Sequence, residues 1–90
     1  MIPDHAQPRL VGGVRLEIDS TTGRGVLLFP EGIVELNETA QDIIARCDGH
    51  TLREIVLGLA QEYDTDVEIL AGDVRETLVD LQRRKLVEFA

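Results

Sequence analysis

The sequence predicts a small α+β domain of the winged helix-turn-helix type, in which a three-stranded antiparallel sheet is followed by three helices. Three observations support this prediction. Short apolar segments, alternating or continuous, occupy the first 36 residues, and glycine and proline separate them. From residue 38 onward, apolar residues recur with helical spacing. Packing the helices on one face of the sheet buries both sets of apolar residues.

The sheet is expected to be a meander with short turns. Its strands cover residues 10–18, 25–29 and 33–36. In the first strand, Val14, Leu16 and Ile18 alternate with charged residues, as they do when one face is buried. The second strand is continuously apolar, which indicates a central position. A turn at Pro30 and Gly32 leads to the third strand, so the first and third strands are edges.

Three helices are expected after the sheet, and each has a start signal. They cover residues 38–47, residues 52–63 and about 17 residues from position 67. Asn37 is the expected N-cap of the first helix. Thr51 with Glu54, and Thr65 with Glu68, have the spacing of capping boxes that open the second and third helices.

The chain of 90 residues is long enough for one domain with a small core of its own. Residues 1–9, with two prolines and no periodicity, are expected to be a flexible N-terminal arm, and residues 10–90 a single domain. No apolar run approaches the roughly 18 residues needed to cross a membrane, and the N-terminus lacks the pattern of a signal peptide. We therefore expect a cytoplasmic protein without membrane association.

The net charge of −8 is concentrated in the helical part, because residues 31–80 contain 13 acidic and three basic side chains. This surface would repel a phosphate backbone. Aromatic residues are only 3% of the chain, so stacking on bases is not expected either. We expect no nucleic-acid partner. A winged-helix DNA-binding domain is still the main alternative, since the fold class permits it, beside other protein-interaction domains.

Candidate catalytic and metal-binding residues are few. Cys47 lies on the apolar stripe of the first expected helix, where a buried thiol is the expected role, and with His50 it provides only two metal ligands. The acidic segment 64–68 resembles the start of a calcium loop but lacks the glycine and the bidentate glutamate of such a loop. The sequence therefore predicts no catalytic residues, no metal and no cofactor.

The third strand offers a binding surface instead. As an edge strand it leaves a row of N–H and C=O groups unpaired, and an extended peptide can add to such a row as a further strand. The residues concerned are Ile33, Val34, Glu35 and Leu36. The same edge can instead be solvated or covered by the N-terminal arm. An open edge beside a long helix also permits a homodimer.

The third helix is expected to form a wall beside this edge. At 100° per residue Arg75, Val79 and Gln82 share one side of the helix and offer a mixed polar and apolar face. The strand would contribute main-chain hydrogen bonds and this face would select side chains. A proline at Val34 is expected to remove a strand donor and so weaken peptide binding.

The residues around the expected third strand resemble a known family. Residues 26–51 read V-L-L-F-P-E-G-I-V-E-L-N-E-T-A-Q-D-I-I-A-R-C-D-G-H-T, and residues 73–87 read D-V-R-E-T-L-V-D-L-Q-R-R-K-L-V. The P-E-G turn followed by L-N-x-T-A, together with the D-G-x-T link, is similar to the signature of the PqqD family of pyrroloquinoline quinone (PQQ) biosynthesis. The likeness extends from about residue 10 to the C-terminus. Similar domains occur in other peptide-modification pathways and within larger enzymes.

The resemblance implies a peptide chaperone, also called a precursor-peptide recognition element, with no catalysis of its own. Such a protein captures the leader of the precursor peptide PqqA and presents it to PqqE, a radical SAM enzyme. In this family the leader adds to the third strand and lies against the third helix. Here that implies a peptide-binding site at residues 33–36 together with Arg75, Leu78, Val79 and Gln82.

Overall fold

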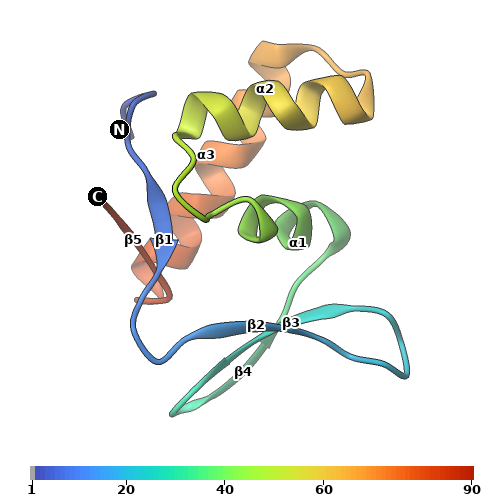
Figure 1. Cartoon of the computed structure of the whole chain (residues 1–90), viewed down its shortest axis with the longest axis vertical. Coiled ribbons are helices and arrows are strands. Elements are labelled where there is room, and N and C mark those ends of the chain that lie inside the picture. The colour runs from blue at the N-terminus through green and yellow to red at the C-terminus, as the bar shows by residue number, and fades with distance from the viewer. Residues whose placement is uncertain (1) are drawn as a thin grey trace.

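The computed structural model describes residues 2–90, which form a body of 34 × 28 × 19 Å. In chain order the elements are β1 (Pro8–Leu10), β2 (Arg15–Ile18), β3 (Gly25–Phe29), β4 (Gly32–Glu35), α1 (Glu38–Ala45), α2 (Leu52–Tyr63), α3 (Val67–Arg83) and β5 (Val87–Phe89). The helices pack together in one half of the molecule, and strands β2 to β4 lie at the other end (Figure 1). The predicted class, an antiparallel sheet followed by three helices, is confirmed. Within the described residues no helix is long and apolar enough to span a membrane.

The three-stranded sheet has the order β2-β3-β4, with β3 central as expected. Leu27 of β3 lies opposite Leu16 on one side and Val34 on the other. Its side chain is fully buried, so these three residues mark the face that the helices cover. The third strand ends one residue earlier than predicted. Leu36 follows the last residue of β4 but still donates its N–H to the Gly25 carbonyl, and its side chain is buried in the core.

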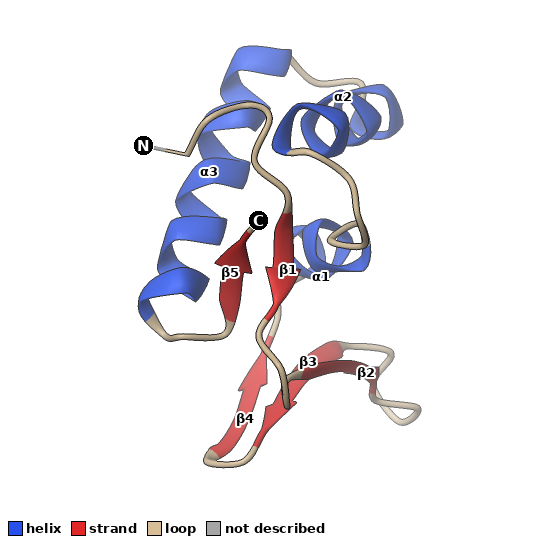
Figure 2. Cartoon of the chain, turned by 60° about the vertical axis from the view of Figure 1, so that its left-hand side comes forward, coloured by secondary structure: helices blue, strands red, loops and turns tan. Residues whose placement is uncertain are grey.

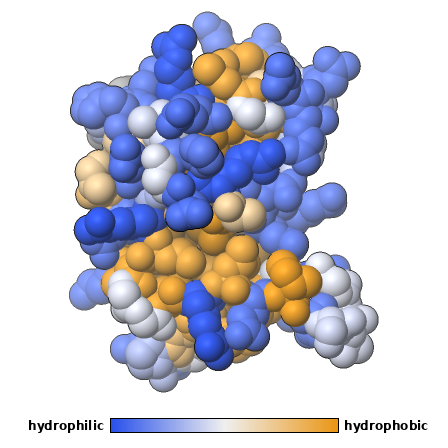
Figure 3. All heavy atoms as spheres, viewed as in Figure 1, coloured by the Kyte–Doolittle hydropathy of each residue, from blue (hydrophilic) through white to orange (hydrophobic). Residues whose placement is uncertain are grey.

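The other face of this sheet has no helix on it. Val26 and Leu28 alternate with the buried Leu27, and both are half-buried. Ile33, which pairs with Leu28, is 60% exposed. Figure 3 shows apolar side chains gathered at this end of the molecule, with polar side chains among them. The sheet therefore buries one face and leaves the other in contact with solvent.

Side-chain caps start all three helices. The Asn37 side chain accepts a hydrogen bond from the backbone N–H of Ala40 (2.7 Å), and the predicted capping box of Thr51 and Glu54 is present. These hydrogen bonds from Thr51 lower the pKa of the exposed Glu54 carboxyl. The third helix differs from the prediction, because its N-cap is Asp66 and not Thr65. An aspartate at this position accepts two N–H groups of the first turn and competes better for the cap.

The first helix is also shorter than predicted. It ends at Ala45, two residues before the expected end, and the Arg46 and Cys47 N–H groups bond to carbonyls three residues earlier. Gln41 joins this helix to the sheet, since its side-chain oxygen accepts from the Gly25 N–H (2.8 Å). A Cβ at Gly25 would lie 2.8 Å from the Gln41 side chain, so a larger residue there would displace Gln41 and disturb this hydrogen bond.

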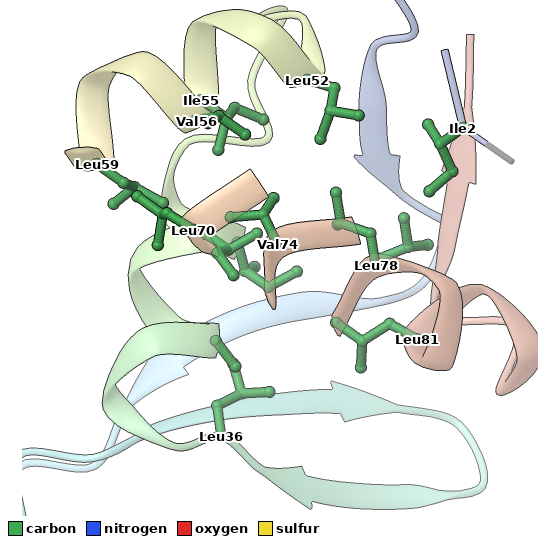
Figure 4. Close-up of a cluster of buried hydrophobic side chains, with 14 of the residues drawn as sticks. Ile2, Leu36, Leu52, Ile55, Val56, Leu59, Leu70, Val74, Leu78 and Leu81 are labelled. Carbon is green, nitrogen blue, oxygen red and sulfur yellow. The ribbon is translucent and has the colours of Figure 1, made fainter. Parts of the chain in front are cut away.

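The hydrophobic core lies between the helices and the two small sheets. One apolar stripe of α3 runs through it, and α2 and α1 pack their apolar faces onto that stripe (Figure 4). The α3 stripe consists of Leu70, Val74, Leu78 and Leu81. No side chain of a polar or charged residue is buried within residues 2–90. Burial of apolar surface is therefore the main force that holds α3 in place.

The N-terminal segment, which we define as residues 2–7, belongs to the folded domain. The flexible arm expected over residues 1–9 is wrong for this part, and position 1 lies outside the described residues. Ile2 is 7% exposed, Ala6 is also buried, and the Ala6 carbonyl accepts from the Leu52 N–H (2.8 Å). The first N–H groups of a helix have no partner within it, so the start of α2 provides a place for this segment to attach.

The expected first strand over residues 10–18 is in fact two strands. β1 ends at Leu10, β2 begins at Arg15, and a turn at Gly13 with φ of +90° separates them. The apolar alternation begins only at Val14, and the glycine pair before it indicates a bend but not a change of sheet.

Strand β5 was not predicted, and it pairs with β1 in an antiparallel ladder. Pro8 lies opposite Phe89, and Leu10 lies opposite Val87. Figure 2 shows the two strands side by side next to α3. Three residues are too few for a periodic pattern, and the partner strand is at the other end of the chain. Only the folded structure reveals this pairing.

We predict that Ile2→Ala lowers the free energy of unfolding by about 2 kcal/mol, because it removes buried methylene and methyl groups from the edge of the core. Ile69→Ala is the matched control. Ile69 is 65% exposed, so its substitution changes stability by less than about 0.5 kcal/mol. Urea denaturation followed by circular dichroism measures both. Equal midpoints for the two variants would show that the N-terminal segment does not stabilise the fold.

Candidate functional site

Strand β4 is an edge strand, and the β3–β4 register determines which of its backbone groups are free. The Leu36 N–H donates to the Gly25 carbonyl (2.9 Å) in the same register as the strands. In an antiparallel ladder, hydrogen-bonded residues alternate with residues whose groups face outward. Val34 therefore bonds toward β3. The N–H and C=O groups of Ile33 and Glu35 face away from the sheet.

This alternation corrects one expectation from the sequence. A proline at Val34 would remove a hydrogen bond of the β3–β4 ladder, not a donor that is open to a guest peptide. Sequence patterns place residues on the two faces of a strand but do not identify the edge toward which each N–H points. The open donors belong to Ile33 and Glu35.

An open depression of about 830 Å³ lies beside β4. Three parts of the chain line it: the end of β4 with the start of α1, the second half of α3, and the N-terminal segment. The lining residues are Ile2, Val34, Glu35, Leu36, Asn37, Thr39, Ala40, Asp73, Arg75, Glu76, Thr77, Val79, Asp80, Leu81, Arg83 and Arg84. The depression thus follows the free edge of the sheet.

The floor of the depression is apolar. Leu36, Ala40 and Leu81 are buried core residues whose surfaces reach it, and Val34 is half-buried beside them. Figure 4 shows Leu36, at the end of β4, and Leu81, from α3, above the β3–β4 hairpin. Side chains of an added strand alternate between its two faces, so every second side chain of a guest would point toward this floor.

The rim of the depression on α3 is polar. We define this rim as Asp73, Thr77, Asp80 and Arg84, which follow a spacing of i, i+4, i+7 and i+11. Such residues form one row along a helix. The row lies directly beside the core stripe of α3, on the flank that faces β4 and α1. Hydrogen-bonding and charged groups are therefore placed opposite the open backbone edge.

The four α3 residues predicted from the sequence are not all in this depression. Arg75 and Val79 line it, but Arg75 lies on the flank toward the N-terminal segment, where it forms an ion pair with Asp4. Leu78 is fully buried in the core, and Gln82 is exposed outside the depression. The structure therefore does not support Leu78 and Gln82 as wall residues.

Three of the four predicted strand residues do line the depression. They are Val34, Glu35 and Leu36. The side chain of Ile33 points to the uncovered face of the sheet, so only its backbone is available at the edge. The α3 rim was missed because both flanks of the core stripe carry polar residues. Which flank faces the sheet depends on how α3 crosses it, and the sequence does not specify that crossing.

The structure also bears on catalysis. No group of three or more His, Cys, Asp or Glu side chains that could hold a metal occurs in the described part of the chain. Burial raises the pKa of the Cys47 thiol to about 12, so the thiolate needed for nucleophilic attack is scarce at neutral pH. What the depression provides is a surface for binding.

The chain is similar to a known protein family. The model of the family named coenzyme PQQ synthesis protein D (PqqD) matches residues 24–87. A relative from Xanthomonas oryzae pv. oryzae, named PqqA binding protein, is 42% identical over 83 residues. The matched part covers 91% of this chain and 90% of the relative.

Two solved structures illustrate the shared fold. The solution structure of the PqqD truncation of Methylobacterium extorquens PqqCD, a stand-alone recognition element for ribosomally synthesised peptides, has a TM-score of 0.80 and 35% identity. Their match covers 90% of this chain and 87% of that one. Lasso peptide synthetase B1, solved with a leader peptide, also has a TM-score of 0.80, with 26% identity. That match covers 92% and 99% of the two chains.

We predict that the amide protons of Ile33 and Glu35 exchange with solvent faster than that of Val34, by on the order of tenfold, because only Val34 bonds toward β3. Hydrogen exchange of the free protein followed by NMR measures these three neighbouring amides in one experiment. Protection of Glu35 with rapid exchange at Val34 would contradict the hydrogen-bond alternation described above.

Proposed function

Because this chain belongs to the PqqD family of coenzyme PQQ synthesis proteins, we propose that it is a non-catalytic chaperone for the precursor peptide PqqA. In this proposal the leader of PqqA adds to β4 as a fourth strand and lies against α3. The single observation that carries the proposal is the open backbone edge of β4 beside an apolar depression. The leader fills both at once.

The chemistry of strand addition fits this edge. The outward N–H and C=O groups of Ile33 and Glu35 can exchange main-chain hydrogen bonds with one face of a guest strand, whatever the sequence of the guest. Side chains that point to the floor would then meet Val34, Leu36 and Leu81, which favour apolar residues. Backbone bonds thus contribute affinity, and the floor and the α3 rim contribute specificity.

The relatives support a peptide as the ligand. A relative with 42% identity is named PqqA binding protein, and one structural neighbour was solved with a leader peptide bound. The acidic net charge of −8 argues against the DNA-binding alternative. So does α3, whose exposed residues Asp73, Glu76 and Asp80 would repel a phosphate backbone.

We further propose that the bound leader is presented to the radical SAM enzyme PqqE. The chaperone would not contact the reacting atoms. By holding the leader while it docks on the enzyme, it would raise the effective concentration of the precursor at the active site. The uncovered face of the sheet and the outer surfaces of the helices stay free for such docking when β4 is occupied.

We predict that Ile33→Pro weakens binding of the PqqA leader by about tenfold, because proline removes one outward N–H and leaves the guest carbonyl without its donor. Ile33→Ala is the matched control. It removes the same exposed side chain but keeps the N–H, and its affinity stays within about twofold of the wild-type value. Calorimetric titration measures the affinities, and NMR spectra verify that both variants are folded. A folded Ile33→Pro variant with wild-type affinity would contradict strand addition at β4.

A further inference from the structure

Charged side chains are distributed unevenly along the depression. On α3, acidic Asp73 and Glu76 lie toward the middle of the helix, and basic Arg83 and Arg84 lie at its C-terminal end. Asp80 lies between the two groups and forms an ion pair with Arg84 (3.3 Å). Arg75 also lines the depression, but its charge is paired with Asp4 on the flank toward the N-terminal segment. The unpaired charges of the lining therefore change from acidic to basic along the helix.

The acidic group and one arginine are available to a ligand. Within residues 2–90 no ion pair involves Asp73, Glu76 or Arg83, and all three are exposed. Opposite charges on a ligand would thus find partners without first breaking an internal ion pair.

The two ends of the depression also differ in their neighbours. β4 runs from the β3–β4 turn toward α1, and the C-terminal end of α3 lies on the side of that turn (Figure 2, Figure 4). Arg83 is therefore near the turn end of the depression, and Asp73 is near the α1 end. Glu31 in the turn does not line the depression, so it does not cancel this polarity.

Helix and strand geometry give the spacing that complementary charges on a guest strand would need. Ten residues separate Asp73 from Arg83, which is about 15 Å along the helix axis. An extended strand covers that length in about four residues. Two strand residues four positions apart point to the same face, so both can be directed toward the depression.

We infer that the depression selects an extended peptide with a basic side chain and an acidic side chain about four residues apart on one face. The basic side chain lies between Asp73 and Glu76, the acidic one lies at Arg83, and apolar floor residues hold the side chain between them. A guest that pairs antiparallel to β4 enters at the α1 end, so its basic residue comes first in sequence. This inference rests on the proposed binding of a leader at β4 and adds the charge pattern that fixes its register.

Exposed charges contribute little affinity each, but they discriminate between registers. Main-chain hydrogen bonds alone would allow the guest strand to shift by two residues, because after such a shift the same set of guest side chains still points toward the apolar floor. A slip of two residues moves each guest charge by about 7 Å, away from its partner. The unslipped register is therefore favoured, and more strongly at low ionic strength.

The test is a titration of the PqqA leader peptide into three forms of the protein at low salt. Asp73→Asn combined with Glu76→Gln lowers the affinity by about threefold to tenfold relative to wild type. The matched control is Asp48→Asn with Glu68→Gln, which removes the same charge from exposed positions that do not line the depression. The control affinity stays within about twofold of the wild-type value. Equal losses in the two double variants would overturn the inference and attribute the effect to net charge.

A second measurement tests the direction. A nitroxide at the N-terminal end of the bound leader broadens the amide signals of Thr39 and Asp73, and a nitroxide at its C-terminal end broadens those of Glu31 and Arg84. The reverse pattern would overturn the inferred polarity but leave the proposed function intact. If wild-type protein bound no leader at all, the proposed function would fail, and the inference would fail with it.

Discussion

The β3–β4 register is the constraint on which the candidate site depends. Because the buried Leu27 must face the helices, Val34 opposite it faces them too, and the backbone of Val34 is committed to β3. A shift of one residue would bury Glu35 and expose Val34, which burial of apolar surface forbids. The same requirement therefore fixes the core, the open groups of Ile33 and Glu35, and the side chains that reach the depression.

An open strand edge is also a hazard, and the sequence around β4 limits it. The strand is only four residues long, Pro30 precedes it in the turn, and Glu35 places a charge at the edge. Short length, proline and charge all oppose unwanted pairing between identical chains. The net charge of −8 adds repulsion between copies. A peptide whose charges complement the depression does not meet this barrier.

How much the sequence could predict depended on how local each signal was. The caps at Asn37 and Thr51 and the central position of β3 follow from residues close together in the sequence, and these predictions are confirmed. The β1–β5 ladder joins the two ends of the chain, and three-residue strands give no periodic signal. The ladder was therefore missed.

The sequence also did not predict which side of α3 faces the sheet. Both sides of the core stripe carry charged residues, so composition does not separate Asp73 and Thr77 from Arg75 and Gln82. Their roles are assigned by the direction in which α3 crosses the sheet. That direction follows from packing against α1, α2 and β5, which involves most of the chain. The strand half of the candidate site was thus predictable from sequence, but the helix half was not.

The two walls of the depression are held mainly by contacts that lie outside it. β4 is bonded to β3, and α3 is held by α1, α2 and the β1–β5 ladder. Arg75 and the buried Ile2 attach the N-terminal segment to the far flank of α3. Because neither wall depends on the other for its position, the space between them persists in the free protein. A guest therefore orders mainly itself on binding, which reduces the entropic cost of association.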